Sequence, residues 1–188
     1  MSKGVNQLQL VEKSIPIFWA NGYRGVTNKQ LAEGIGVSYS YLYNQLGKQQ
    51  LFLDSLNSYL SREIDPAFES IKNAEDGLEA IRDVFYHLAD AKYNNEPCTC
   101  MVMNIALELR HEVPGLKKVY NRFLTSLRDA FETGIRNTQR NIGGFVKEDI
   151  LPYTEMMVSI LFGLNFLVEF KSSEDLKEYI DSHFSLIK

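Results

Sequence analysis

Residues able to carry catalysis or hold a metal ion are few and badly spaced in this chain. Cys98 and Cys100 are two positions apart, so on a helix they point to nearly opposite sides and make a poor disulfide. The histidines, His87, His111 and His183, lack metal-ligand spacing relative to the cysteines. The HExxH zinc motif, the GxxxxGK[S/T] phosphate loop and the nucleophile elbow are absent from the sequence. We therefore expect no enzyme, no metal site and no cofactor.

Side chains suited to DNA contacts are instead concentrated between residues 27 and 48. Thr27 and Gln30 have the spacing of a capping box, which predicts a helix that carries Leu31, Ala32 and Ile35 inward. Gly36 breaks this helix, and Ser38 offers a second N-cap for a helix of about two turns through Gln45. Two short helices around a glycine turn are the pattern of a helix-turn-helix.

Small residues would let these two helices cross closely, with Ala32 at the crossing and Gly36 in the turn. Val37 and Leu42 would fill the space between them. The second helix could then enter a DNA major groove, about 12 Å wide, with its outward side chains, which are Tyr39, Ser40, Tyr41, Asn44 and Gln45. A helical hairpin with a glycine turn also occurs in proteins that never contact DNA, so the hairpin alone does not decide the function.

Charge is unevenly distributed along the 188 residues, whose formal net charge is −4. Residues 1–50 hold five basic and two acidic side chains and carry +3, whereas the remainder carries −7. A mildly basic segment on an acidic body is compatible with phosphate binding by one end of the chain.

This segment resembles the tetracycline-repressor (TetR) family of bacterial regulators. About 45 residues carry the resemblance, namely Phe18, Gly22-Tyr23, Thr27, Leu31-Ala32, Gly36-Val37-Ser38, Leu42-Tyr43, Gly47-Lys48 and Leu51-Phe52. The stretch from Cys100 to Leu109 and the pair Gly163-Leu164 resemble the family's C-terminal domain less specifically.

The resemblance implies roles for individual positions. Thr27, Tyr43 and Lys48 match residues that contact phosphates. Asn28, Lys29, Tyr39, Ser40, Tyr41, Asn44 and Gln45 match positions that approach base edges or phosphates. Asparagine and glutamine can pair with adenine through two hydrogen bonds, which favours Asn44 and Gln45 as direct readers.

Two departures from the family pattern affect this assignment. The spacing from Gly47 to Leu51 is one residue shorter than usual, which could displace Lys48. Tyr41 occupies a position that commonly holds a small residue. Both departures could alter the docking angle or the preferred sequence.

Helical periodicity continues through the rest of the chain, and strand signals are essentially absent. The first helix should end at Gly22, with Pro16 marking either a kink or a late start. After Gly47 a long helix should follow, and further helices are expected near residues 76–94, 98–110, 115–139, 150–170 and 174–187. The clearest apolar stripe runs from Leu116 to Ile135, with Pro114 suited to the first turn of that helix. The predicted fold is all-α, with a helix-turn-helix domain at residues 1–47 and a helical ligand-binding and dimerisation domain at 48–188.

A ligand pocket in the larger domain is a weaker prediction, because aromatic and methionine positions are mostly core. Asn104 and Asn165 lie in apolar helical runs, where each amide must either bond a neighbouring helix or orient a ligand. Burial is the favoured interpretation for the cysteines, with a reactive Cys100 facing a pocket as the alternative. The candidate pocket residues are Cys100, Met103, Asn104, Tyr120, Phe123, Phe162, Asn165 and Phe166.

These observations together predict a sequence-specific transcriptional regulator that binds double-stranded operator DNA. By resemblance it would be a homodimer through its last two helices and a repressor released by a small-molecule inducer. The alternative is a small-molecule binding protein whose helix-turn-helix has lost operator recognition. An all-helical enzyme or adaptor has no supporting motif. Three features favour a cytoplasmic location. The sequence starts without a secretory signal, it contains no membrane-spanning run, and its two cysteines are closely spaced.

Overall fold

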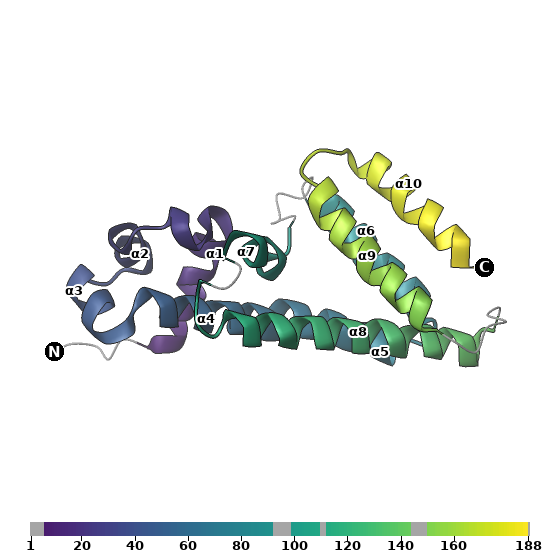
Figure 1. Ribbon diagram of the computed structural model, residues 1–188, viewed down its shortest axis with the longest axis horizontal. Coiled ribbons are helices and arrows are strands. Elements are labelled where there is room, and N and C mark those ends of the chain that lie inside the picture. The colour runs from purple at the N-terminus through teal and green to yellow at the C-terminus, as the bar shows by residue number, and fades with distance from the viewer. Residues whose placement is uncertain (1–5, 92–98, 110–111, 144–149, 188) are drawn as a thin grey trace. The chain divides into compact units, whose positions relative to one another are not determined.

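The computed structural model describes residues 6–91, 99–109, 112–143 and 150–187, and its regular elements in these ranges are all helical (Figure 1). The predicted all-α fold class is confirmed. The elements are α1 Gln7–Gly25, α2 Asn28–Ile35, α3 Tyr39–Tyr41, a π-helical turn Leu42–Leu46, α4 Lys48–Tyr59, a second π-helical turn Leu60–Ile64, α5 Asp65–Asn73, α6 Gly77–Ala91, α7 Met101–Leu109, α8 Leu116–Asn141, α9 Leu151–Leu167, α10 Ser173–Phe184 and a 3-10 turn Ser185–Ile187.

The chain forms two compact units, each built from two segments. Unit 1 contains Met1–Glu63 and Asn104–Arg122, and unit 2 contains Ile64–Met103 and Phe123–Lys188. Unit 1 therefore holds the helix-turn-helix together with α4 and parts of α7 and α8. The domain boundary expected at residue 47 stays a prediction.

The core of unit 1 is formed where α1 packs against α4. Phe18 and Phe52 are fully buried, and their rings meet edge to face with centroids 5.1 Å apart. On the same pair of helices, the buried hydroxyls of Ser14 and Ser55 lie 2.5 Å apart and share a hydrogen bond. Each serine hydroxyl also lies within hydrogen-bond distance of a carbonyl oxygen of its own helix. These polar groups are therefore satisfied inside the core. The contact fixes how α4 crosses the helix that leads into the helix-turn-helix.

The first helix departs from regular geometry at Gly22 and not at Pro16. Asn6 caps α1, which begins at Gln7, so the late start considered for Pro16 is wrong. Gly22 has φ 68° and ψ 177°, a conformation that is open essentially to glycine alone. The helix is expected to end at Gly22; regular helical geometry does break there, but one further helical turn follows and α1 ends at Gly25.

Close packing of two glycines organises unit 2. Gly77, at the start of α6, lies against Gly134 of α8 so closely that a Cβ on Gly77 would be 2.2 Å from the Gly134 Cα. The apolar stripe of α8 is buried as predicted, including Phe123, Leu127, Phe131 and Ile135. Phe85 of α6 packs edge to face on Phe131 and on Phe184 of α10, which joins three helices around one core.

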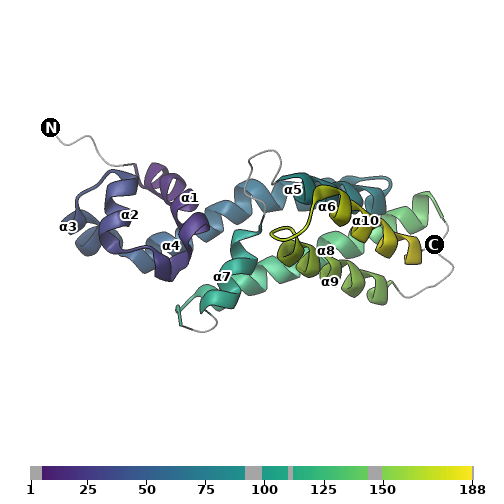
Figure 2. The ribbon, with the colours of Figure 1, turned by 90° about the horizontal axis from the view of Figure 1, so that it is seen from above.

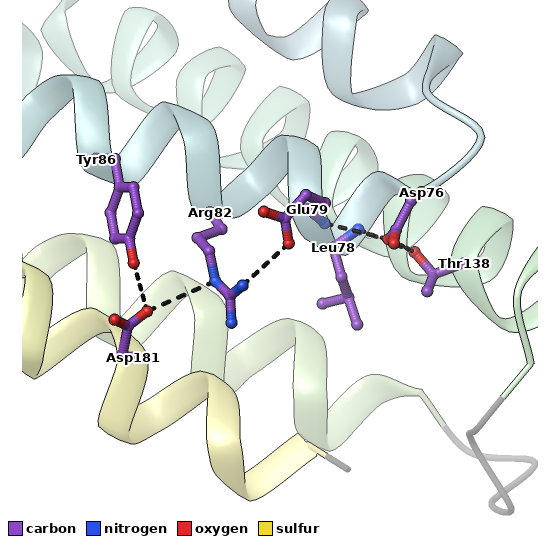
Figure 3. A network of polar contacts seen from close by, with 7 residues as sticks. All are labelled: Asp76, Leu78, Glu79, Arg82, Tyr86, Thr138 and Asp181. Atoms are coloured by element: carbon purple, nitrogen blue, oxygen red, sulfur yellow. Dashed lines mark hydrogen bonds and ion pairs between the residues drawn. The ribbon is translucent and has the colours of Figure 1, made fainter.

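Polar contacts fix the start and the middle of α6 (Figure 3). The Thr138 hydroxyl donates to Asp76 at 2.9 Å and accepts the Leu78 N–H at 2.9 Å, so an α8 side chain caps the start of α6. Farther along, the Tyr86 hydroxyl donates to Asp181 at 2.5 Å, and Arg82 Nε lies 3.7 Å from the same carboxylate. The second group ties α6 to α10.

Helices α9 and α10 pack together and run side by side in both views (Figures 1 and 2). Exposed apolar side chains on and after α9 include Leu151, Phe166 and Phe170. The expected first-turn position of Pro114 is wrong, because α8 begins at Leu116 and Pro114 lies in the turn before it. Cys98 and His111 lie outside the described residues. Within the described ranges, no helix is both long and apolar enough to cross a membrane.

Candidate nucleic-acid interface

The two helices of the hairpin begin at the caps that the sequence predicts. The Thr27 hydroxyl accepts the Gln30 N–H at 3.2 Å, and the Gln30 side chain accepts the Thr27 N–H at 2.9 Å. Ser38 Oγ accepts the Tyr41 N–H at 3.1 Å and opens the second helix. Between them, Gly36 adopts φ 81° and ψ 36°, and its N–H bonds the end of α2. The predicted capping box, second N-cap and glycine turn are confirmed.

One side of the hairpin forms part of the core. Leu31, Ala32, Ile35 and Leu42 are all buried, as expected for residues at a helix crossing. Val37 is half-buried in the turn. The opposite side is therefore free to carry polar and aromatic groups.

The winding of the second helix differs from the prediction. Only Tyr39–Tyr41 is α-helical, and Leu42–Leu46 forms a π-helical turn that the Gly47 N–H closes on the Leu42 carbonyl at 2.8 Å. Gly47 has φ 71°, and α4 begins directly after it at Lys48. The predicted continuous helix through Gln45 is thus replaced by a wider turn, of the kind often found at functional sites.

The exposed face of this second helix carries two pairs of residues spaced four apart. Tyr39 and Tyr43 are 53% and 65% exposed, and their rings stack with centroids 6.0 Å apart and planes within 10°. Ser40 and Asn44 are also exposed, and Asn44 Nδ2 donates to Ser40 Oγ at 3.0 Å. Exposed aromatic and amide groups are those able to contact bases and phosphates.

The remaining candidate DNA-contact residues vary in accessibility. Gln45 is exposed, whereas Tyr41 is half-buried. On α2, Lys29 is exposed with Glu33 at 4.0 Å, and Asn28 is half-buried. Thr27 is exposed, although its hydroxyl already caps α2.

Lys48 has a different environment from the other candidates. Its amine donates to the Val26 carbonyl and lies 4.4 Å from the centroid of the Tyr23 ring. Burial lowers the pKa of the Lys48 amine, and the Glu108 carboxylate partly offsets that effect. The side chain is thus turned toward the connection between α1 and α2, where it fixes the entry to the helix-turn-helix.

Glu108 is a positioning residue that the sequence analysis missed. Its carboxylate, on α7, accepts the Tyr23 N–H at 3.1 Å and the Arg24 N–H at 2.7 Å. The available signal was that Glu108 is the single charged residue in the apolar run from Cys100 to Leu109. Such a residue on a largely buried helix needs a partner, but the sequence does not say which.

The predicted pocket residues divide between the two units. Asn104 and Tyr120 belong to unit 1, whereas the other candidates belong to unit 2. Met103, Phe123 and Asn165 are buried, Cys100, Tyr120 and Phe162 are half-buried, and Asn104 and Phe166 are exposed. A hollow of about 320 Å³ beside α9 and α10 is lined by other residues, namely Leu167, Lys171, Asp175, Leu176, Glu178, Tyr179 and Ser182. The pocket stays a prediction.

For Asn165 the structure supplies a neighbouring partner. Its Oδ1 accepts the Cys100 N–H at 2.6 Å, just before α7 begins at Met101. The amide therefore bonds a backbone group at a helix start that lacks an intrahelical partner. This bond is the first of the two roles considered for Asn165, and a role in orienting a ligand stays a prediction.

Solved structures with the same fold include TetR-family transcriptional regulators. The regulator CifR, in a cysteine mutant complexed with 26-bp double-strand operator DNA, matches with a TM-score of 0.81 and 17% identity over the whole of both chains. A TetR regulator from Chloroflexus aurantiacus matches at 0.77 and 17%, over 96% of this chain and 93% of that one. FadR from Bacillus subtilis, in complex with stearoyl-CoA, matches at 0.68 and 17%, over 97% of each chain. The resemblance that the sequence indicated is confirmed by this shared fold.

In sequence, the chain is similar to a protein of Bacillus subtilis (strain 168), the uncharacterized HTH-type transcriptional regulator YezE. The two are 26% identical over 183 residues, which span 95% of this chain and 94% of YezE. No protein-family model matches the chain.

Proposed function

We propose that this chain is a sequence-specific DNA-binding transcriptional regulator. The observation that carries the proposal is the exposed face of α3 and the following π turn, where Tyr39, Ser40, Tyr43, Asn44 and Gln45 project from a capped helix-turn-helix. These groups include the amides that recognise adenine and hydroxyls that contact phosphates. The fold shared with an operator-bound regulator and the similarity to YezE support the same function.

The regulator would act as a homodimer through α9 and α10. Support comes from Leu151, Phe166 and Phe170, large apolar side chains left exposed on and after α9. A dimer would place two recognition helices on the half-sites of a near-palindrome, about one helical turn or somewhat more apart.

Operator release by a small-molecule effector is the second part of the proposal. An effector can shift the DNA-binding equilibrium only if it binds the free and DNA-bound conformations with different affinity. Stearoyl-CoA, the ligand in the FadR structure of the same fold, is a suitable first probe. Loss of operator binding on its addition would indicate a repressor relieved by an acyl-CoA, and unchanged binding would exclude that effector.

The test is selection of bound sequences from a random duplex pool, followed by titration of the selected duplex at two salt concentrations. A palindromic consensus bound at about nanomolar Kd with a steep salt dependence is expected, because phosphate contacts release counterions. A Tyr39→Ala/Asn44→Ala variant should lose the selection, and Asn57→Ala, at an exposed position on α4, should retain it.

A small-molecule binding protein that has lost operator recognition is the alternative. The short Gly47–Leu51 spacing and the amine of Lys48, turned toward Val26, favour this alternative. It predicts no enriched sequence and only weak binding that disappears as salt is raised. That result would overturn the proposed function.

A further inference from the structure

Of the two amides on the exposed recognition face, Asn44 is the one held in place. Asn44 Nδ2 donates to Ser40 Oγ at 3.0 Å, across one turn of the helix. Within the described part of the chain, no side-chain hydrogen bond holds Gln45, which also has one more rotatable bond to order. Asn44 is therefore ordered before DNA arrives and Gln45 is not.

The bond to Ser40 leaves the Asn44 amide able to pair with a base. A carboxamide has two N–H donors on its nitrogen and an acceptor oxygen. Adenine presents the N7 acceptor and the N6 amino donor in the major groove, and pairing with it uses the amide oxygen and the N–H on the same side as that oxygen. The second N–H is left over, and it can be donated to Ser40 Oγ while the first pairs with N7. Holding Asn44 and reading adenine are thus compatible.

The neighbouring residues are also ordered in advance. Tyr39 and Tyr43 directly precede Ser40 and Asn44 in the chain, and their stacked rings hold each other across the same helical turn. Each pair uses the spacing at which helical side chains meet. Ordering a side chain before binding lowers the entropy lost on binding, so a held amide should discriminate bases better than a free one.

We propose that Ser40 is a positioning residue that aligns Asn44 to recognise one adenine in each half-site. The inference rests on the proposed DNA-binding function. It makes two separable statements: the selected half-site contains an adenine read by Asn44, and the strength of that preference depends on the Ser40 hydroxyl.

The experiment measures relative affinity for duplexes carrying each of the four base pairs at every position of the selected half-site. Wild type should prefer adenine at one position by about tenfold, the discrimination typical of a two-bond amide contact. Asn44→Ala should abolish this preference, and Ser40→Ala should lower it by about threefold. Ser40→Thr, which keeps a γ-hydroxyl, should retain it. In the Asn44→Ala background, Ser40→Ala should have no further effect on base preference.

A modified base tests the predicted atom directly. Replacing the adenine by 7-deazaadenine removes the N7 acceptor, so it should weaken wild type by up to about tenfold and leave Asn44→Ala unaffected. Asn57→Ala is the matched control, because Asn57 is an exposed asparagine on α4 whose amide bonds the Leu53 carbonyl. Far-UV circular dichroism and the Tm of Ser40→Ala should match wild type.

Any different outcome contradicts either the inference or the proposed function. If Ser40→Ala weakens all duplexes equally, or alters the preference at a different position, Ser40 does not position Asn44 and the inference is overturned. A selected half-site without an adenine that depends on Asn44 overturns it as well, with the proposed function left standing. Failure of wild type to select any sequence overturns the proposed function itself.

Discussion

The carboxylate of Glu108 on α7 accepts the backbone N–H of Tyr23 at 3.1 Å. It accepts the next N–H, that of Arg24, at 2.7 Å. Both amides follow Gly22, where α1 leaves helical geometry, so they begin a new helical turn and lack partners within the chain's own helix. A carboxylate at such a start acts as an N-cap supplied from another helix. Through this contact α7 holds the segment that leads into α2.

Glu108→Ala should destabilise unit 1. The variant removes the acceptor for two backbone N–H groups, and hydrogen bonds to a charged group contribute about 2 kcal/mol each before solvent exposure reduces them. We expect the free energy of unfolding to fall by about 2 kcal/mol in all. Urea unfolding followed by the fluorescence of Trp19, the single tryptophan, reports on this unit. The control is Glu112→Ala, which breaks an exposed ion pair with Arg24 and should change little. Equal losses of stability in the two variants would show that the Glu108 contact stabilises unit 1 no more than an exposed ion pair does.

Gly22→Ala should destabilise the same unit for two reasons. Gly22 has φ 68°, a conformation that side chains rarely adopt, and an added Cβ would lie 2.5 Å from Glu108 Oε2. Strain of this kind costs about 1 to 3 kcal/mol. Gly25→Ala is the matched control: a Cβ there would lie at an ordinary 3.7 Å from the Asn21 Cβ, so the variant should be neutral or slightly stabilising. Urea unfolding followed by Trp19 fluorescence compares the stability of the two variants. A Gly22→Ala protein as stable as wild type would contradict the close contact between Gly22 and Glu108.

The parts of the fold that the sequence predicts are those set by local rules. The capping box of Thr27 and Gln30, the cap of Ser38 and the turn at Gly36 each depend on residues within four positions of one another. Apolar periodicity likewise predicts the buried face of α8, because a helix of any orientation must bury its apolar stripe.

Contacts between distant positions could not be predicted in the same way. Glu108 and Tyr23 are 85 positions apart, and nothing in either residue type indicates the other. The π turn at Leu42–Leu46 shows the same limit, since periodicity does not distinguish it from α-helix. The pocket residues are predicted from aromatic, sulfur-containing and amide side chains in apolar helical runs, and such runs indicate burial and not a cavity.

Gly77→Ala should destabilise unit 2. A Cβ at this position would meet the backbone of Gly134 at 2.2 to 2.4 Å, and backbone on a packed helix cannot move aside as a side chain can. Forcing α6 away from α8 should cost about 3 kcal/mol, at the upper end for overpacked cores. Gly163→Ala is the comparison: its Cβ would meet the Tyr179 hydroxyl at 2.6 Å, the far end of a flexible side chain, and should cost much less. Thermal unfolding monitored by circular dichroism measures both. A Gly163→Ala loss as large as that of Gly77→Ala would argue against this distinction.

Asp90→Asn should reduce stability in a pH-dependent way. A hydrogen bond from Lys177, followed by one from the Ser173 hydroxyl, lowers the pKa of the Asp90 carboxyl below its usual range. Because the folded state then binds the proton more weakly than the unfolded state, this contribution is present above about pH 4 and is lost as pH falls through the lowered pKa. Wild type should therefore exceed Asp90→Asn in Tm at pH 6, and the difference should disappear in strong acid. Lys177→Met should give a similar loss and the double variant no larger one. A difference independent of pH would exclude the ion pair as its cause.

Tyr43→Phe should weaken binding to every duplex by a similar factor. Tyr43 is exposed, and the substitution removes only its hydroxyl, so the stack on Tyr39 remains. Phosphate contacts carry no base information, and one neutral hydrogen bond accounts for about a fivefold change in affinity. The slope of affinity against salt should stay the same, because no charge is removed. Gln45→Ala is the comparison, since loss of an amide that contacts a base should relax the preference at a single base pair, distinct from the one assigned to Asn44. Titration of the selected duplex and its single-base variants distinguishes the two, and equal sequence-independent losses for both would contradict this division between phosphate and base contacts.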